Sequence, residues 1–135
     1  MRSVFDVLAR HVEPSLRRSL VGELLRRGVT GSAIARCLGV SPSLVTRYSK
    51  GERGLHELSA IPEVAEGLRR LADGAASGSL CGPPLYAELA MLAMLVMSRK
   101  YACGIHHLIS RDVNPATCDV CPRLFGRLFT AAKPA

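Results

Sequence analysis

Tryptophan and glutamine are absent from this sequence, and asparagine occurs once, at Asn114. A chain so poor in thermolabile amides is typical of heat-stable proteins. A compositional bias toward Arg, Ala, Leu and Gly produces the same scarcity, so both explanations stay open.

Long apolar runs are missing as well. The longest extends from Leu89 to Met97, well short of the roughly 20 residues that a membrane-spanning helix needs. The first residues, Met1–Asp6, do not form the apolar core of a secretory signal. We therefore expect a cytoplasmic protein without a membrane partner.

Patterns typical of catalysis are also lacking, since we find no glycine-rich nucleotide loop, carboxylate pair or Ser-His-Asp set. We expect no enzymatic activity. Positive charge is abundant instead, because 18 Lys and Arg face 11 Asp and Glu, a formal net charge of +7. Such a chain suits the phosphate backbone of a nucleic acid, which arginine binds in bidentate fashion.

Apolar residues recur three and four apart from Val4 to Leu71 without strict alternation, which predicts an all-α fold. The expected helices cover about 3–11, 14–27, two helices within 31–50, 62–72 and 84–100. The small residues of Gly74–Ser79 resemble a flexible linker. We therefore predict a DNA-binding domain over 1–74 and a helical, cysteine-bearing dimerisation module over 79–135.

The segment Gly31–Lys50 meets the steric demands of a helix-turn-helix. Ala35 suits the closest approach of the two helices, and Gly39 suits a turn with positive φ. Ser41 is a good N-cap and Pro42 a good first helical residue. The inward positions are all apolar: Ile34, Leu38, Val40 and Val45.

The outer face of the second helix of this motif carries hydrogen-bond donors. We predict that Arg47 contacts a base, as a bidentate donor to guanine, and that Thr46 also faces the DNA. Phosphate contacts are expected from Ser41, Ser43, Lys50 and Arg53.

The stretch from Pro14 to Gly54 resembles the lambda-repressor-like, or Xre-type, family, especially short archaeal predicted transcriptional regulators. The resemblance rests on the helix-turn-helix, on the following Tyr48-Ser49-Lys50-Gly51-Glu52-Arg53-Gly54, and on the terminal Cys118-Asp119-Val120-Cys121. It implies a compact helical domain that binds operator DNA as a dimer, with paired recognition helices in successive major grooves. A winged helix is the nearest structural alternative, although no hairpin of alternating residues follows Tyr48.

Four of the five cysteines lie in the C-terminal part. Cys81, Cys103, Cys118 and Cys121 can supply a [4Fe-4S] cluster or a zinc ion, with His106 or His107 as a substitute ligand. Disulfides or reduced, buried thiols are the alternatives. Cys37 lies between Arg36 and Leu38, where we expect it to fill the core.

The helix from Leu85 to Met97 is apolar almost all round, Glu88 apart, so its whole circumference needs covering. Pairing with a second copy of the chain is the economical solution, and we predict a homodimer. A ligand pocket lined by Met91, Met94 and Met97 is the alternative.

These observations together predict a homodimeric, sequence-specific transcriptional regulator that responds to redox state or metal through its C-terminal cysteines. The alternative among binding proteins is a coactivator or RNA-associated scaffold with a structural metal site. The alternative from another class is an iron–sulfur enzyme or electron carrier.

Overall fold

A computed structural model of the chain describes residues 1–130, which form helices and turns without a strand. The predicted all-α class is therefore confirmed for this part, and it contains no hairpin of the kind a winged helix needs. Residues 131–135 of the predicted C-terminal module lie outside the described residues. The elements are α1 Val4–Val7, the π-helix η1 Leu8–Val12, α2 Glu13–Arg26, α3 Gly31–Leu38, α4 Pro42–Ser49, α5 Pro62–Ala76, α6 Pro83–Ser98, α7 Cys103–Ile109, α8 Val120–Phe125 and α9 Arg127–Thr130.

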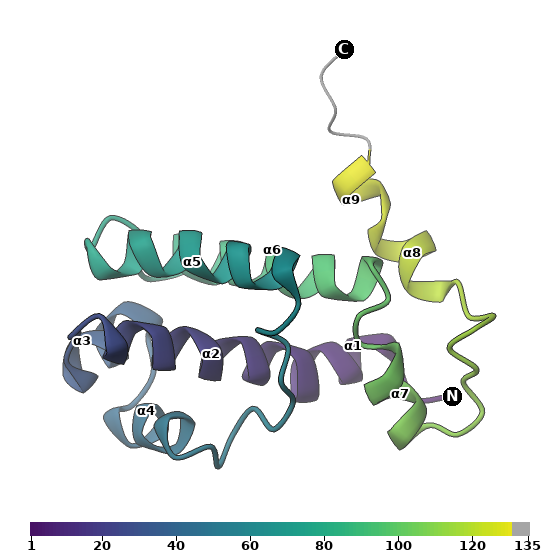
Figure 1. The fold of residues 1–135 in the computed structure, drawn as a ribbon, viewed down its shortest axis with the longest axis horizontal. Helices are drawn as coiled ribbons and strands as arrows, with labels where there is room; N and C mark the ends of the chain where they lie inside the picture. The colour runs from purple at the N-terminus through teal and green to yellow at the C-terminus, as the bar shows by residue number, and fades with distance from the viewer. Residues whose placement is uncertain (131–135) are drawn as a thin grey trace.

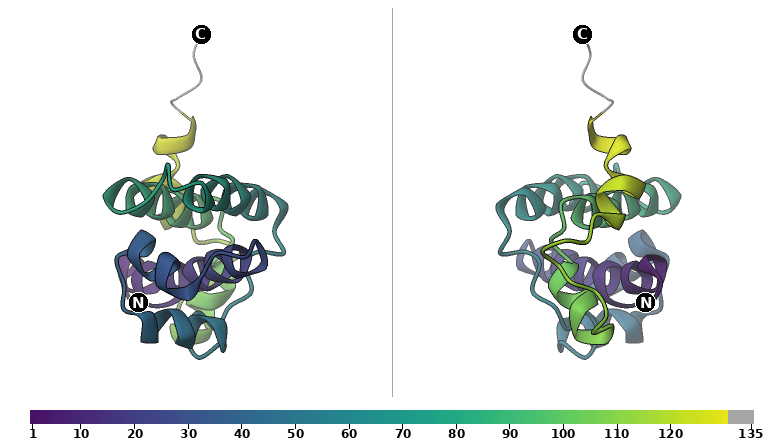
Figure 2. Two further views of the ribbon diagram at one scale, coloured as in Figure 1. Left: turned by 90° about the vertical axis from the view of Figure 1, so that its left-hand side faces the viewer. Right: turned by 90° about the vertical axis from the view of Figure 1, so that its right-hand side faces the viewer.

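The helices are stacked in layers (Figure 1). The antiparallel pair α5 and α6 forms one outer layer, the continuous run α1–η1–α2 lies beneath it, and α4 packs on the opposite side of α2. Figure 2 shows the same order from both ends of the molecule. The helix α4 and the pair α5–α6 thus occupy opposite faces.

The first helical run is longer than predicted, because α1, η1 and α2 join without a break from Val4 to Arg26. Within it, the Glu13 N–H donates to the Leu8 carbonyl, five residues back. Pro14 has no N–H and would clash with a carbonyl four residues earlier in a regular helix, so a widened turn fits here. The Ser15 hydroxyl donates to the His11 carbonyl at 2.7 Å and so satisfies an acceptor at this turn.

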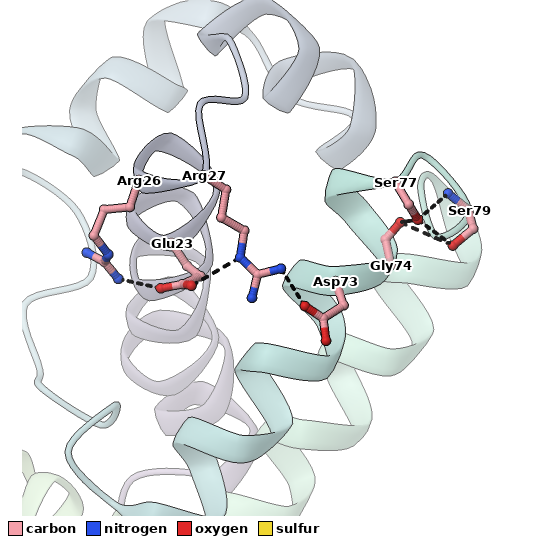
Figure 3. Close-up of polar contacts among 7 residues, drawn as sticks. All are labelled: Glu23, Arg26, Arg27, Asp73, Gly74, Ser77 and Ser79. Carbon is pink, nitrogen blue, oxygen red and sulfur yellow. Dashed lines mark hydrogen bonds and ion pairs between the residues drawn. The ribbon is translucent and has the colours of Figure 1, made fainter.

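The interpretation of Gly74–Ser79 as a flexible linker is wrong. Helix α5 continues to Ala76, and the residues after it form a tight turn into α6. The Gly74 carbonyl accepts hydrogen bonds from the Ser77 and Ser79 hydroxyls at 3.1 and 3.3 Å (Figure 3). It also accepts one from the Leu80 N–H at 3.0 Å. Glycine and serine suit a tight turn as well as a flexible linker, so composition alone did not distinguish them.

Most of the apolar helix α6 is covered by its own chain. It packs against α2, α5 and α8, and Leu89, Ala93 and Val96 are at most 1% exposed. Met97 is buried as well, and Met91 is 39% exposed. Covering α6 therefore does not need a second copy of the chain, and its buried residues belong to one cluster with those of α1–α5.

No helix within residues 1–130 combines the length and apolar character that crossing a membrane requires.

Candidate nucleic-acid interface

Helices α3 and α4 are joined by a short turn whose geometry follows from its residues. The Thr30 and Ser41 hydroxyls cap the two helices by accepting from the N–H groups of Ala33 and Leu44, both at 3.2 Å. Gly39 closes α3 in the left-handed conformation, with φ of 68°, and Pro42 follows the Ser41 cap. The predicted positive φ and the predicted cap are therefore confirmed.

The inner face of α4 fixes the helix on the rest of the fold. Val45 and Tyr48 are buried, 3% and 6% exposed, against α2 and α3. Burial raises the pKa of the Tyr48 hydroxyl. Of the predicted inward set, Ile34 is also buried, whereas Leu38 and Val40 pack at the edge of the core.

The turn after α4 is held against the start of α2. Gly51 and Gly54 both have positive φ, 73° and 71°. A methyl group on Gly54 would overlap the Pro14 carbonyl and the Arg18 Cβ, so only glycine fits without a shift. The Arg18 guanidinium donates to the Gly54 carbonyl at 3.0 Å. Positive φ at Gly51, and positive φ together with close packing at Gly54, give a physical reason for both glycines in the stretch from Tyr48 to Gly54.

All six predicted DNA-contacting side chains are exposed: Ser41, Ser43, Thr46, Arg47, Lys50 and Arg53. Three of them also have local partners. The Ser41 and Ser43 hydroxyl oxygens are 3.1 Å apart. The Thr46 hydroxyl donates to the Pro42 carbonyl at 3.2 Å, which uses its one proton within the helix. Thr46 is therefore the weakest donor of the set toward a ligand.

Three of the six side chains are cations: Arg47, Lys50 and Arg53. Among the described residues, none of them forms an ion pair within 4.0 Å. Arg36 on α3 joins them, since it is also exposed and has no ion pair within the described part of the chain, and sequence reasoning missed it. The sequence contains no acidic residue between Glu23 and Glu52. The exposed side of α3 and α4 is thus a region of uncompensated positive charge, which we name the α3–α4 face.

The arginines of α2 behave differently. Arg17 pairs with Glu13 at 2.9 Å, and Glu23 receives both Arg26 and Arg27, at 2.8 and 3.1 Å. Arg27 reaches on to Asp73 of α5 (Figure 3). The guanidinium hydrogen bonds lower the pKa of the Glu23 carboxyl. Most of the positive charge of α2 is therefore neutralised within the fold.

The structure places Cys81 in a disulfide with Cys37, 44 residues earlier in the chain, with the two Cα atoms 4.5 Å apart. Cys37 is therefore more than core filling, and Cys81 is not free to act as the predicted metal ligand while the bond exists. The bond joins α3 to the turn that precedes α6. Neither cysteine belongs to a local Cys-x-x-Cys pair, so spacing did not reveal the connection.

The other three predicted ligands, Cys103, Cys118 and Cys121, carry free thiols. Burial raises the pKa of Cys121 to about 11, and its Cys103 and Cys118 neighbours add to the effect. Burial also raises the pKa of Cys103. The three thiols are thus near one another, and Cys103 and Cys121 favour their protonated forms.

The two histidines considered as substitute ligands, His106 and His107, form hydrogen bonds with backbone carbonyl oxygens instead of facing these thiols through one. His106 Nε2 lies 2.8 Å from the Arg2 carbonyl oxygen, and His107 Nδ1 lies 2.7 Å from that of Val113. Across residues 1–130, no three His, Cys, Asp or Glu side chains are grouped so as to hold a metal ion. The predicted cluster or zinc ion therefore has no preformed site in the described part.

Comparison of the chain with family models, with curated proteins and with solved structures finds no match. The resemblance to the lambda-repressor-like family rests on the motif residues alone.

Proposed function

We propose that this protein is a sequence-specific DNA-binding regulator of transcription, with α4 as its recognition helix. The observation that carries the proposal is the α3–α4 face: exposed Arg36, Arg47, Lys50 and Arg53 have no ion pair within residues 1–130, and no acidic residue lies between Glu23 and Glu52. Unpaired cations on an exposed helix can replace the counterions of a phosphate backbone without first breaking internal salt bridges.

The dimensions of α4 suit a major groove. A helix with its side chains is about 10–12 Å in diameter, which fits the groove width of about 12 Å, and the eight residues of α4 extend about 12 Å along it. Arg47 lies in the last turn of α4, on its exposed side, and is the candidate for a base contact. Lys50 and Arg53 follow at the carboxyl end, where the chain passes the groove edge, and fit phosphate contacts.

A homodimer is part of the proposal, and the layer order limits its geometry. Two copies that read neighbouring half-sites must present both α4 helices on one side of the dimer. Because α5 and α6 cover the face opposite α4 (Figure 1), copies joined back to back through α5–α6 would direct their α4 helices apart. The proposed dimer therefore forms side by side.

Selection of bound duplexes from random DNA tests the function. We expect an inverted repeat to be enriched, and light scattering of the complex should give two chains per repeat. Recovery of no consensus, or tighter binding of RNA than of DNA, would refute the operator model. RNA preference would instead support a scaffold function.

Arg47→Ala tests the base contact within the selected site. We expect it to cost about 1–3 kcal/mol and to relax the preference at one base position. Arg111→Ala is the matched control, since Arg111 is also an exposed arginine but lies after α7. The DNA affinity of this variant should stay unchanged. An equal loss on all sequences would assign Arg47 to a phosphate instead.

The remaining part of the proposal is a response to redox state or metal through Cys103, Cys118 and Cys121. Anaerobic purification with an absorption spectrum and metal analysis tests it. A bound iron–sulfur cluster or zinc ion would support it, whereas a colourless, metal-free protein whose DNA affinity is the same before and after thiol oxidation would remove it.

A further inference from the structure

A cavity of about 490 Å³ lies beside α2, between α4 and α5. Residues of α2, of α4, of α5 and of the chain that connects α4 to α5 line it. Gly22 leaves space along α2, and the buried side chains of Tyr48 and Leu68 contribute from α4 and α5. Cavities of this size accommodate small-molecule ligands.

Three arginines line the cavity: Arg18 and Arg26 from α2, and Arg69 from α5. Arg18 and Arg26 are held in place by the Gly54 carbonyl and by Glu23. Arg69 has neither an ion pair nor a hydrogen bond among the described residues, so its five donors are available. Two guanidinium groups with hydrogen-bond partners and one without a partner among the described residues thus line the cavity from two helices.

The other polar side chains that line the cavity are three serine hydroxyls, His56 and two carboxylates, Glu23 in its salt bridges with Arg26 and Arg27 and Glu57 without one among the described residues. Ser19, Ser49 and Ser59 line the cavity, and Glu57 accepts from the Ser59 N–H at 3.1 Å. His56 also lines it, and burial together with His11 lowers the pKa of His56, which favours its neutral form. Because Glu23 is paired with Arg26 and Arg27, Arg18 and Arg69 supply the positive charge that is left for a ligand.

We propose that this cavity binds a small molecule that carries a phosphate or a carboxylate group. Guanidinium groups match both anions geometrically and bond them in bidentate fashion. Arg69 would bind the anion directly, with Arg18 and Arg26 as neighbours. The serine hydroxyls would donate to oxygens that the arginines leave free.

The site is separate from the α3–α4 face. Its connection to α4 runs through Tyr48 and Ser49, which belong to the same helix as Arg47 but line the cavity. A bound anion would therefore contact the carboxyl end of α4 from the side of α2. Binding itself does not depend on the proposed DNA-binding function and is measured without DNA.

Titrations followed by NMR test the proposal, with inorganic phosphate and citrate as separate probes at constant ionic strength. We expect saturable shifts of the Gly22, Ser49 and Ser59 amides and of the Arg69 Nε–H. Saturation by phosphate alone assigns a phosphate ligand, and saturation by citrate alone assigns a carboxylate. Shifts confined to the α3–α4 face, or shifts that never saturate, would overturn the proposal.

Arg69→Glu is the decisive variant and Arg70→Glu its matched control. Both arginines are exposed on α5, but only Arg69 lines this cavity. Loss of a charge-assisted contact should weaken probe binding by about tenfold or more in Arg69→Glu, while Arg70→Glu binds as the unmodified chain does. Equal weakening in both would mean that net charge alone attracts the anion, and the site would be rejected. Unchanged circular dichroism and Tm in both variants establish that folding is intact.

Discussion

Reducing the Cys37–Cys81 disulfide should destabilise the protein by an amount that its position in the chain sets. The bond closes a loop between residues 44 positions apart. The chain-entropy relation gives about 4 kcal/mol at 25 °C for such a loop, and measured disulfides usually contribute about 2–4 kcal/mol. We therefore expect a loss of 2 to 4 kcal/mol on reduction, enough to lower Tm by many degrees in a domain of this size.

The folded state should survive reduction. The Gly82 N–H donates to the Cys37 carbonyl at 2.8 Å, and the α3 and α6 contacts do not require the covalent bond. Most of the loss therefore comes from the greater freedom of the unfolded chain. Circular dichroism of the reduced protein should still show a helical fold.

Urea unfolding with and without a phosphine reductant measures the difference, and alkylation establishes the thiol count. The denatured, unreduced protein should take up three alkyl groups, and the reduced one five, as the three free cysteines and one disulfide require. Cys81→Ala should be less stable and insensitive to reductant, while Cys103→Ser should keep the full sensitivity. Five alkyl groups without reductant, or equal stability in both redox states, would refute the reasoning.

Two further predictions concern the turn after α4. Gly54→Ala should cost about 3 kcal/mol or more in unfolding free energy, because positive φ costs about 1–2 kcal/mol and overlap with Pro14 adds to it. Gly78→Ala, where φ is also positive but the space is open, should cost only the φ penalty in the same urea experiment; equal losses would contradict the overlap. Because the folded pKa of His56 is lowered, its stabilising contribution is full above the unfolded value near 6.5 and declines as the pH falls below it. Urea midpoints at pH 7.5 and 5.5 should therefore differ more for the unmodified chain than for His56→Asn, and identical differences would exclude this titration.

The geometry of α3, its turn and α4 was predictable because each requirement lies within a few residues. Gly39, Ser41 and Pro42 specify a left-handed turn, a cap and a first helical turn whatever the rest of the chain does. The outward set follows once the inward residues are known. Arg36 follows from the same argument applied to α3, since its neighbours Ala35 and Cys37 are buried.

Contacts between distant residues were not predictable in this way. Periodicity shows that α6 needs covering, but it does not distinguish a second chain from α2, α5 and α8 of the same chain. The pairing of Cys37 with Cys81 and the approach of Gly54 to Pro14 likewise join segments more than 35 positions apart. The cavity with Arg69 depends on such an approach too, because α2, α4 and α5 form it together.

The π-turn of η1 has a consequence for the register of the first helical run. Val7 and Val12 are both fully buried, although five residues separate them, whereas a regular helix brings residues three or four apart to the same side. Pro14→Ala would restore an N–H group but not a regular helix. Tightening the turn would rotate either Val4 and Val7, or Leu16 and the residues after it, away from the core. The widened turn is therefore required by the positions of the buried apolar side chains before and after it. Pro14 favours the same geometry but does not determine it alone.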